Sequence, residues 1–269
     1  MKEVFINNGI PCAKGELVKN LNHALSIIEK IGFPAILKPD YGVGASGIFV
    51  INNHQDLHNI IPSLQSDYLL EEFVSAPMLT FDGLAGANGE ILFANSLEYS
   101  EGILEYVHGK DPSFFINKQI DPVLMQLGER LVKAFNIKKR FFHFEFFKME
   151  DEVKYWPVEI NCRPPGGPII DMMNYSVDQD LYQSYARLIA GEDVHLANEK
   201  KYYCGYVGRR FGKHYFNEHD LVMKRYDSYF VECVENPHVF RQAMGDFRYI
   251  FRTDDEVILK KIMAELLTH

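Results

Sequence analysis

One stretch, residues 140–167, constrains the fold of this chain more than any other. Two runs rich in aromatic and β-branched residues, 141–149 and 154–160, flank the short polar segment 150–153. Strands favour aromatic and β-branched side chains, and turns favour polar ones, so the pattern predicts a β-hairpin. If the turn is centred near Glu152, residues whose numbers sum to about 304 face each other. Glu145 then lies directly opposite Glu159.

The facing glutamates indicate a site for a cation. Side chains alternate along a strand, so Asn161 falls on the same face as Glu159. Two carboxylates across a strand pair in an apolar hairpin repel each other unless a positive charge lies between them. Carboxylate and amide oxygens suit Mg²⁺, which keeps some waters and shares phosphate ligands. The alternative is a pair of exposed glutamates on an edge hairpin, because a one-residue slip would separate their faces.

The residues after the second strand favour the cation site. Arg163 follows Asn161 by two positions, and the rigid and then flexible segment 164–167 ends the strand. An arginine beside a metal ion is well suited to clamp a phosphoryl group, because its fork of donors matches phosphate oxygens. The pattern Glu-x-Asn-x-Arg after a strand-borne Glu therefore predicts phosphoryl chemistry.

This pattern resembles the metal-binding signature of the ATP-grasp superfamily, especially its carboxylate-amine and carboxylate-thiol ligases. The resemblance covers roughly residues 10–191. It implies that Glu145, Glu159 and Asn161 hold Mg²⁺ or Mn²⁺ on the phosphates of ATP. It also implies that Arg163 is catalytic and steadies the transferred phosphoryl group.

A glycine-rich segment earlier in the chain gives a second, weaker signal. Lys38 ends a short apolar strand, and glycines at positions 42, 44 and 47 follow it before another strand. Such a loop can bring backbone N–H groups close to an anion, although a plain glycine-rich hairpin has the same composition. By resemblance it is the ATP-grasp phosphate loop, with Lys38, Gly44, Ser46 and Gly47 contacting ATP. Lys38 is also a catalytic candidate.

Three further expectations concern ligand contacts. We expect a strand at 68–74, and by resemblance its end is the hinge between the lobes, which contacts adenine through Glu71, Glu72, Phe73 and Val74. From the residues alone, Asp82 either faces the nucleotide or metal or points outward, and His143 either supports Glu145 or is a hydrogen-bonded core histidine. Arg209 and Arg210 are either ligands for a substrate carboxylate or ordinary surface arginines.

Composition excludes several classes of partner. The net charge is −9, and the sequence has no Lys/Arg-rich run, which argues against nucleic acid or an anionic membrane as the main partner. The four cysteines have no Cys-x-x-Cys spacing, and neither a signal peptide nor a membrane span is recognisable. We therefore expect a cytoplasmic protein that acts on small molecules.

Together these features predict an α+β ATP-grasp fold, in which two α+β lobes with antiparallel sheets clasp ATP. We expect a small lobe at 1–75, a large lobe at 76–200 and a C-terminal α+β extension at 201–269 packed on the large lobe. The resemblance implies an ATP- and Mg²⁺-dependent carboxylate-amine ligase that forms a C–N bond through an acyl phosphate.

Two alternatives to the ligase stay open. One is a biotin-carboxylase-like enzyme using bicarbonate, and the other is a non-catalytic ATP-binding regulatory module. Family members usually carry a further α/β domain before the position where this chain begins. We therefore expect either a truncated chain or a partner chain or homodimer that completes the N-terminal region.

Overall fold

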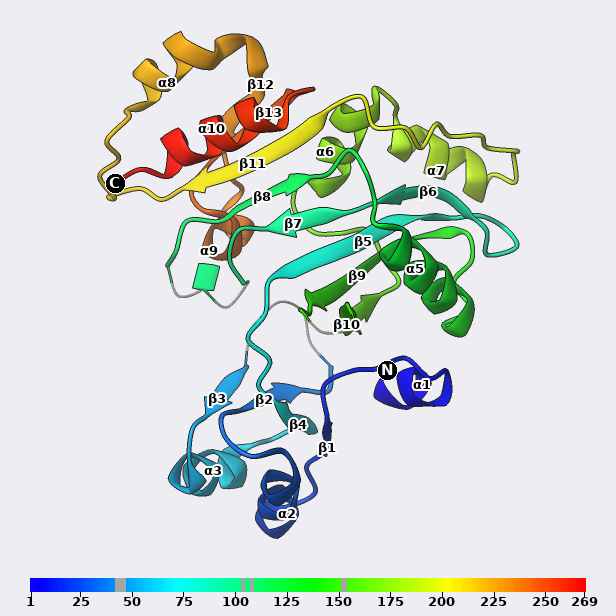
Figure 1. Cartoon of the computed structure of the whole chain (residues 1–269), viewed down its shortest axis with the longest axis vertical. Helices are drawn as coiled ribbons and strands as arrows, with labels where there is room; N and C mark the ends of the chain where they lie inside the picture. The colour runs from blue at the N-terminus through cyan, green and yellow to red at the C-terminus, as the bar shows by residue number, and fades with distance from the viewer. Residues whose placement is uncertain (42–46, 103–104, 107–108, 151–153) are drawn as a thin grey trace. The chain divides into compact units, whose positions relative to one another are not determined.

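A computed structural model describes residues 1–41, 47–102, 105–106, 109–150 and 154–269. The chain forms two compact units (Figure 1). The smaller unit is Gly9–Ala76, and the larger unit combines Met1–Asn8 with Pro77–His269. Residues 1–8, which we had grouped with the small lobe, thus belong to the larger unit, where the Phe5 and Phe135 rings lie 5.7 Å apart.

The smaller unit is a four-stranded antiparallel sheet covered by helices. The strand order is β1-β4-β2-β3. Helix α2 begins where the Asn20 side chain accepts a hydrogen bond from the His23 N–H, and it ends at Gly32, whose φ is +76°. Apolar side chains of α2 and α3 pack against Leu37 and Leu70 of the sheet. The elements are β1 (Gly15–Leu17), α2 (Leu21–Ile31), β2 (Ala35–Pro39), β3 (Phe49–Ile51), α3 (His54–Ile60), the 3₁₀ turn η1 (Ile61–Ser63) and β4 (Tyr68–Glu72).

The larger unit is built on one antiparallel sheet of nine described strands. Eight of them follow the order β10-β9-β5-β7-β8-β11-β13-β12, and β6 pairs with β5 beside this path. The last three strands of that order come from the predicted C-terminal extension, so its residues continue the same sheet. The strands are β5 (Met78–Ala85), β6 (Ile91–Asn95), β7 (Leu97–Tyr99), β8 (Ser113–Ile116), β9 (Arg140–Lys148), β10 (Tyr155–Asn161), β11 (Tyr203–Arg209), β12 (Phe230–Glu235) and β13 (Phe247–Thr253).

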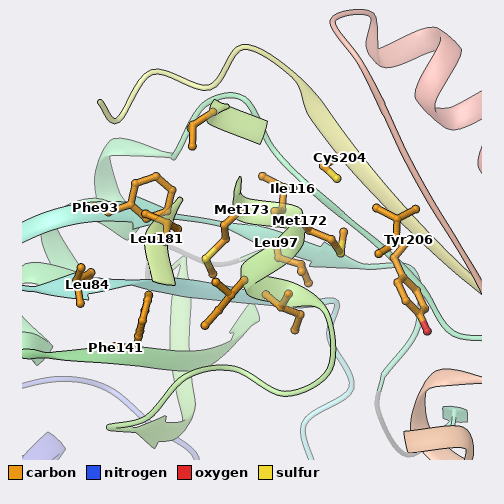
Figure 2. Close-up of a cluster of buried hydrophobic side chains, with 14 of the residues drawn as sticks. Leu84, Phe93, Leu97, Ile116, Phe141, Met172, Met173, Leu181, Cys204 and Tyr206 are labelled. Carbon is orange, nitrogen blue, oxygen red and sulfur yellow. The ribbon is translucent and has the colours of Figure 1, made fainter. Parts of the chain in front are cut away.

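Helices cover both faces of this sheet. On one face, Gly128 of α5 meets the Phe81 ring, and α10 packs on β11 and β13. On the other face, α6 and α7 cover a buried cluster that includes Phe93, Phe141 and Met173, and Figure 2 shows the side chains of strands and helices meeting there. The helices are α1 (Lys2–Asn7), α5 (Pro122–Ala134), α6 (Ile169–Val177), α7 (Leu181–Ile189), α8 (His219–Tyr226), α9 (Arg241–Met244) and α10 (Glu256–Leu267), with the 3₁₀ turns η2 (Asp227–Tyr229) and η3 (His238–Phe240).

The predicted α+β class with antiparallel sheets is confirmed. Among the described residues, no helix combines the length and the apolar character that crossing a membrane requires.

Candidate active site

The predicted hairpin is formed by β9 and β10, and its two glutamates face each other. Glu159 is the Cα partner of Glu145, and Asn161 is the partner of His143. An irregularity between Pro157 and Glu159 shifts the register by one residue. This β-bulge leaves Val158 as the extra residue and brings Glu159, rather than Val158, opposite Glu145. The predicted turn around Glu152 lies outside the described residues.

Asn161 and Arg163 continue from the same strand. The Nδ2 atom of Asn161 is buried and has no hydrogen-bond partner among the described residues. Arg163 is exposed just past the end of β10, and its guanidinium donates a 2.9 Å hydrogen bond to the carbonyl of Pro164. Pro165 is buried and anchors the segment that follows. The strand end therefore presents an amide and an arginine next to the facing glutamates.

A buried polar network lies beside Glu145 on the same face of the sheet. Asp82 has no exposed surface, and it accepts hydrogen bonds from His143 Nδ1 at 2.6 Å, Thr80 Oγ1 at 2.5 Å and Asn95 Nδ2 at 3.3 Å. His143 Nε2 lies 3.2 Å from Glu145 Oε1. Of the alternatives for Asp82, the outward-facing one is therefore wrong. His143 is a buried, hydrogen-bonded histidine that also contacts Glu145, so both descriptions we had opposed hold.

The histidine carries a positive charge at neutral pH. Burial alone would lower the pKa of His143, but the adjacent carboxylates of Asp82 and Glu145 raise this pKa to about 10. Both ring nitrogens lie next to carboxylate oxygens, which accept hydrogen bonds and donate none, so both nitrogens bear protons. His143 is thus an imidazolium between two carboxylates.

Tyr99 completes this face, and sequence reasoning missed it. Burial and then the negative charges of Glu145, Asp82 and Glu159 raise the pKa of Tyr99 well above its ordinary value, so its hydroxyl stays neutral near the carboxylates. The residue ends β7, a strand of three residues that follows β6 after one residue. Only the pairing of β7 with β5 brings it here, and no local spacing in the sequence signals that pairing.

The donor set of this face fits a divalent cation. Glu145 uses Oε1 for His143, and a carboxylate accepts about four hydrogen bonds or ligands, so capacity for a cation remains. A rotation of the buried Asn161 amide exchanges its nitrogen and oxygen, which lets this position offer an oxygen. Within the described ranges no cluster of three or more His, Cys, Asp or Glu side chains is arranged to hold a metal ion by itself. The arrangement suits Mg²⁺, which commonly takes its remaining ligands from water and phosphate.

In the smaller unit, the predicted nucleotide residues divide into described and undescribed ones. Lys38 Nζ lies 2.6 Å from Glu71 Oε2, so these two candidates form an ion pair with each other. The Glu72 side chain accepts a 2.7 Å hydrogen bond from the backbone N–H of Lys14, which links β1 to β4. Gly44 and Ser46 lie outside the described residues.

The remaining candidates of this unit follow or precede its strands. Phe73 is exposed, and its N–H donates to the carbonyl of Pro34 at 3.3 Å. Val74 is partly buried in the segment after β4. Gly47 has a φ of +77°, a backbone conformation that favours glycine.

Arg209 is buried and Arg210 is partly buried, and both donate hydrogen bonds to backbone carbonyls. Arg209 is buried, and it donates to the carbonyls of Leu266 at 2.8 Å and Asn217 at 2.9 Å. Arg210 donates to carbonyls that include those of Tyr106 and Gln242. Both arginines bind loops of the larger unit, and a role for either in holding a substrate carboxylate stays a prediction.

Comparisons with known proteins agree with this geometry. A family model described as an ATP-grasp domain matches residues 31–171. The L-arginine-specific L-amino acid ligase of Bacillus subtilis is 28% identical over 208 residues, which cover 73% of this chain and 50% of that protein. The chain therefore spans about half the length of this relative.

Solved structures show the same fold. An L-amino acid ligase from Bacillus licheniformis superposes with a TM-score of 0.71 at 13% identity, covering 98% of this chain and 68% of that one. N5-carboxyaminoimidazole synthetase from Staphylococcus aureus, solved with ADP, gives a TM-score of 0.71 at 16% identity, covering 98% and 68%. The family match spans more than half of the chain, and the hairpin carries the facing glutamates that first suggested the resemblance, so the chain belongs to the ATP-grasp family.

Proposed function

We propose that the chain is an ATP- and Mg²⁺-dependent ligase that activates a carboxylate as an acyl phosphate for attack by an amine. The observation that carries this proposal is the β9–β10 register, which sets Glu145 opposite Glu159 with Asn161 on the same face. The family match and the names of the relatives, which are ligases and synthetases, support it.

Each residue then has a defined task in phosphoryl transfer. Glu145, Glu159 and Asn161 would hold Mg²⁺, which, when bound, neutralises charge on the phosphates of ATP. Arg163 would clamp the transferred phosphoryl group, because its exposed guanidinium offers paired donors. Lys38 would contact the ATP phosphates with protons that its ion pair with Glu71 does not use, since an ammonium group has three donors.

Residues of the smaller unit would bind the nucleotide. We assign the phosphate loop to Gly44, Ser46 and Gly47, and the adenine contacts to the segment 71–74. Within the segment 71–74, Phe73 and Val74 are the stronger candidates for adenine contacts, because the side chains of Glu71 and Glu72 already bond to other residues of the smaller unit. We further propose that a partner chain or a second copy completes the site.

A calorimetric titration of ATP tests the metal site. We expect the wild type to bind ATP more tightly with Mg²⁺ than with EDTA, and Glu159→Gln to lose most of this difference, because it removes one ligand charge at constant shape. The matched control is Glu98→Gln, the same change on the opposite face of the sheet, where Glu98 accepts from Asn117 at 3.0 Å. An equal loss in both variants, or no Mg²⁺ dependence in the wild type, would refute the proposed site.

A screen for ADP release then identifies the reaction. Amino acids come first as acids and amines, because the B. subtilis relative is named an amino acid ligase. ADP release that requires both an acid and an amine supports the ligase. Release that requires bicarbonate favours the biotin-carboxylase-like alternative, and binding without release with any acceptor, even after a candidate N-terminal partner is added, favours the regulatory module.

A further inference from the structure

We propose that Asp82 and His143 are positioning residues that hold Glu145 in the orientation in which it receives the metal ion. The inference rests on the proposed function, because it concerns the same metal site. It assigns to two buried residues a task beyond packing, and it makes them determinants of metal affinity.

The geometry excludes His143 itself as a metal ligand. Its Nδ1 lies 2.6 Å from Asp82 Oδ1 and its Nε2 lies 3.2 Å from Glu145 Oε1. Each ring nitrogen already has a carboxylate oxygen as its hydrogen-bond partner, so neither is directed at an open position for a metal ion. The ring therefore acts on the site through Glu145, to which it donates.

Asp82 fixes the ring. Its carboxylate is completely buried and is itself held by Thr80 at 2.5 Å and Asn95 at 3.3 Å. These contacts come from β5 and β6, whereas His143 and Glu145 lie on β9, which pairs with β5 so that Asp82 faces His143. The network thus ties Glu145 to the centre of the sheet, and ring and carboxylate have little room to rotate.

Fixing Glu145 in advance strengthens metal binding for an entropic reason. Ordering a free glutamate side chain on binding costs conformational entropy, because the side chain loses rotamer freedom. If the network has already ordered it, binding does not bear this cost.

The experiment measures metal affinity and nucleotide affinity separately in the full chain. Mn²⁺ is titrated into the protein with ADP while electron paramagnetic resonance reports the free ion, and ADP binding in EDTA is measured by calorimetry. We expect His143→Gln to weaken Mn²⁺ binding about 10- to 100-fold, as loss of a hydrogen-bond partner of a metal ligand typically does. ADP binding in EDTA should stay unchanged.

Two further variants separate positioning from general damage. Asp82→Asn keeps the shape of the side chain that holds the His143 ring, and it should also weaken Mn²⁺ binding. This variant tests the proposal if His143→Gln does not fold. The variant that combines Asp82→Asn with His143→Gln should bind Mn²⁺ no more weakly than His143→Gln alone, because both residues act through Glu145. The control is Phe142→Leu, which perturbs packing on the opposite face, where Phe142 stacks on Phe81 at 5.6 Å, and it should leave Mn²⁺ affinity unchanged.

The outcomes discriminate between the two proposals. If the wild type binds Mn²⁺ with ADP and His143→Gln and Asp82→Asn bind it equally well, the positioning role is refuted while the proposed metal site stands. If Phe142→Leu weakens Mn²⁺ binding as much as His143→Gln does, the effect is general and the positioning role is again refuted. A wild type that binds no Mn²⁺ with ADP refutes the metal site, and the inference falls with it.

Discussion

The buried Lys200 should lower the stability of this protein at neutral pH, and replacing it with methionine tests that. Lys200 is 4% exposed, and its Nζ donates to the carbonyls of Ala94 at 2.6 Å and Asn198 at 3.2 Å and lies 4.2 Å from the centre of the Phe93 ring. None of these partners is a carboxylate. Burial lowers the pKa of the Lys200 ammonium to about 8.

The sign and the size follow from linkage. In the unfolded chain a lysine has a pKa near 10.4, so between about pH 8 and 10.4 the unfolded state binds more protons and stability rises with pH. Below about pH 8 both states are charged, and the fold bears the full cost of roughly 3 kcal/mol. Lys200→Met removes this cost, but it also removes the donor to the buried carbonyl of Ala94, which costs about 1–3 kcal/mol, and the donor to the partly buried carbonyl of Asn198.

The variant should therefore be more stable than the wild type at pH 7.5, and this advantage should shrink by about 2 kcal/mol by pH 9.5. Urea unfolding of both proteins at the two pH values measures it. The control is Lys201→Met, which removes the neighbouring exposed lysine that bonds Asp178 at 3.1 Å, and whose effect should be the same at both pH values. If the stability difference between Lys200→Met and the wild type does not change with pH, burial does not lower the pKa of Lys200, and the reasoning is refuted.

Two further predictions concern helices of the larger unit. Gly128→Ala would place a Cβ atom 2.2 Å from Cε1 of the buried Phe81 ring, so the overpacking cost of about 1–3 kcal/mol should exceed the helix-propensity gain of roughly 1 kcal/mol; a raised melting temperature would contradict this. The Asp255 side chain caps α10 by accepting a hydrogen bond from the Val257 N–H at 2.7 Å. Asp255→Ala removes this cap and should lower the free energy of unfolding by about 1 kcal/mol, whereas Asp255→Asn keeps an acceptor and should not lower it. Chemical denaturation that finds equal losses for both Asp255 variants would refute the capping role.

Local signals in the sequence predicted much of the fold. The short apolar strand that Lys38 was expected to end and the strand expected after the glycines are β2 and β3. The hairpin of β9 and β10 was predicted with its facing glutamates, although the register changes at the Val158 bulge. Strand β8 was not predicted, because pairing with the distant strand β11 and with β7 defines it.

The environment of the site was harder to predict, because it depends on pairing between distant strands. Asp82 and His143 are 61 residues apart, and β5 and β9 bring them together only after the whole sheet has formed. Single-residue patterns left the role of each of them open. The ion pair of Lys38 with Glu71 was also unforeseen, because the resemblance assigned both residues to the nucleotide and the pairing of β2 with β4 places them side by side.

Lys200 lowers the stability of the fold, but it also bonds to β6, the strand that supports the proposed site. Strand β6 pairs with β5 on one edge, and on the other the Asn198 side chain bonds the N–H of Ala94 at 2.8 Å and the carbonyl of Leu92 at 3.0 Å, while Lys200 bonds the carbonyl of Ala94. The next residue, Asn95, donates to Asp82. Two side chains after α7 thus satisfy the edge that would otherwise expose unpaired backbone groups, and they hold the strand that supports Asp82, then His143, and finally Glu145. A destabilising buried charge is therefore consistent with the proposal that Glu145 has to be held in a fixed orientation.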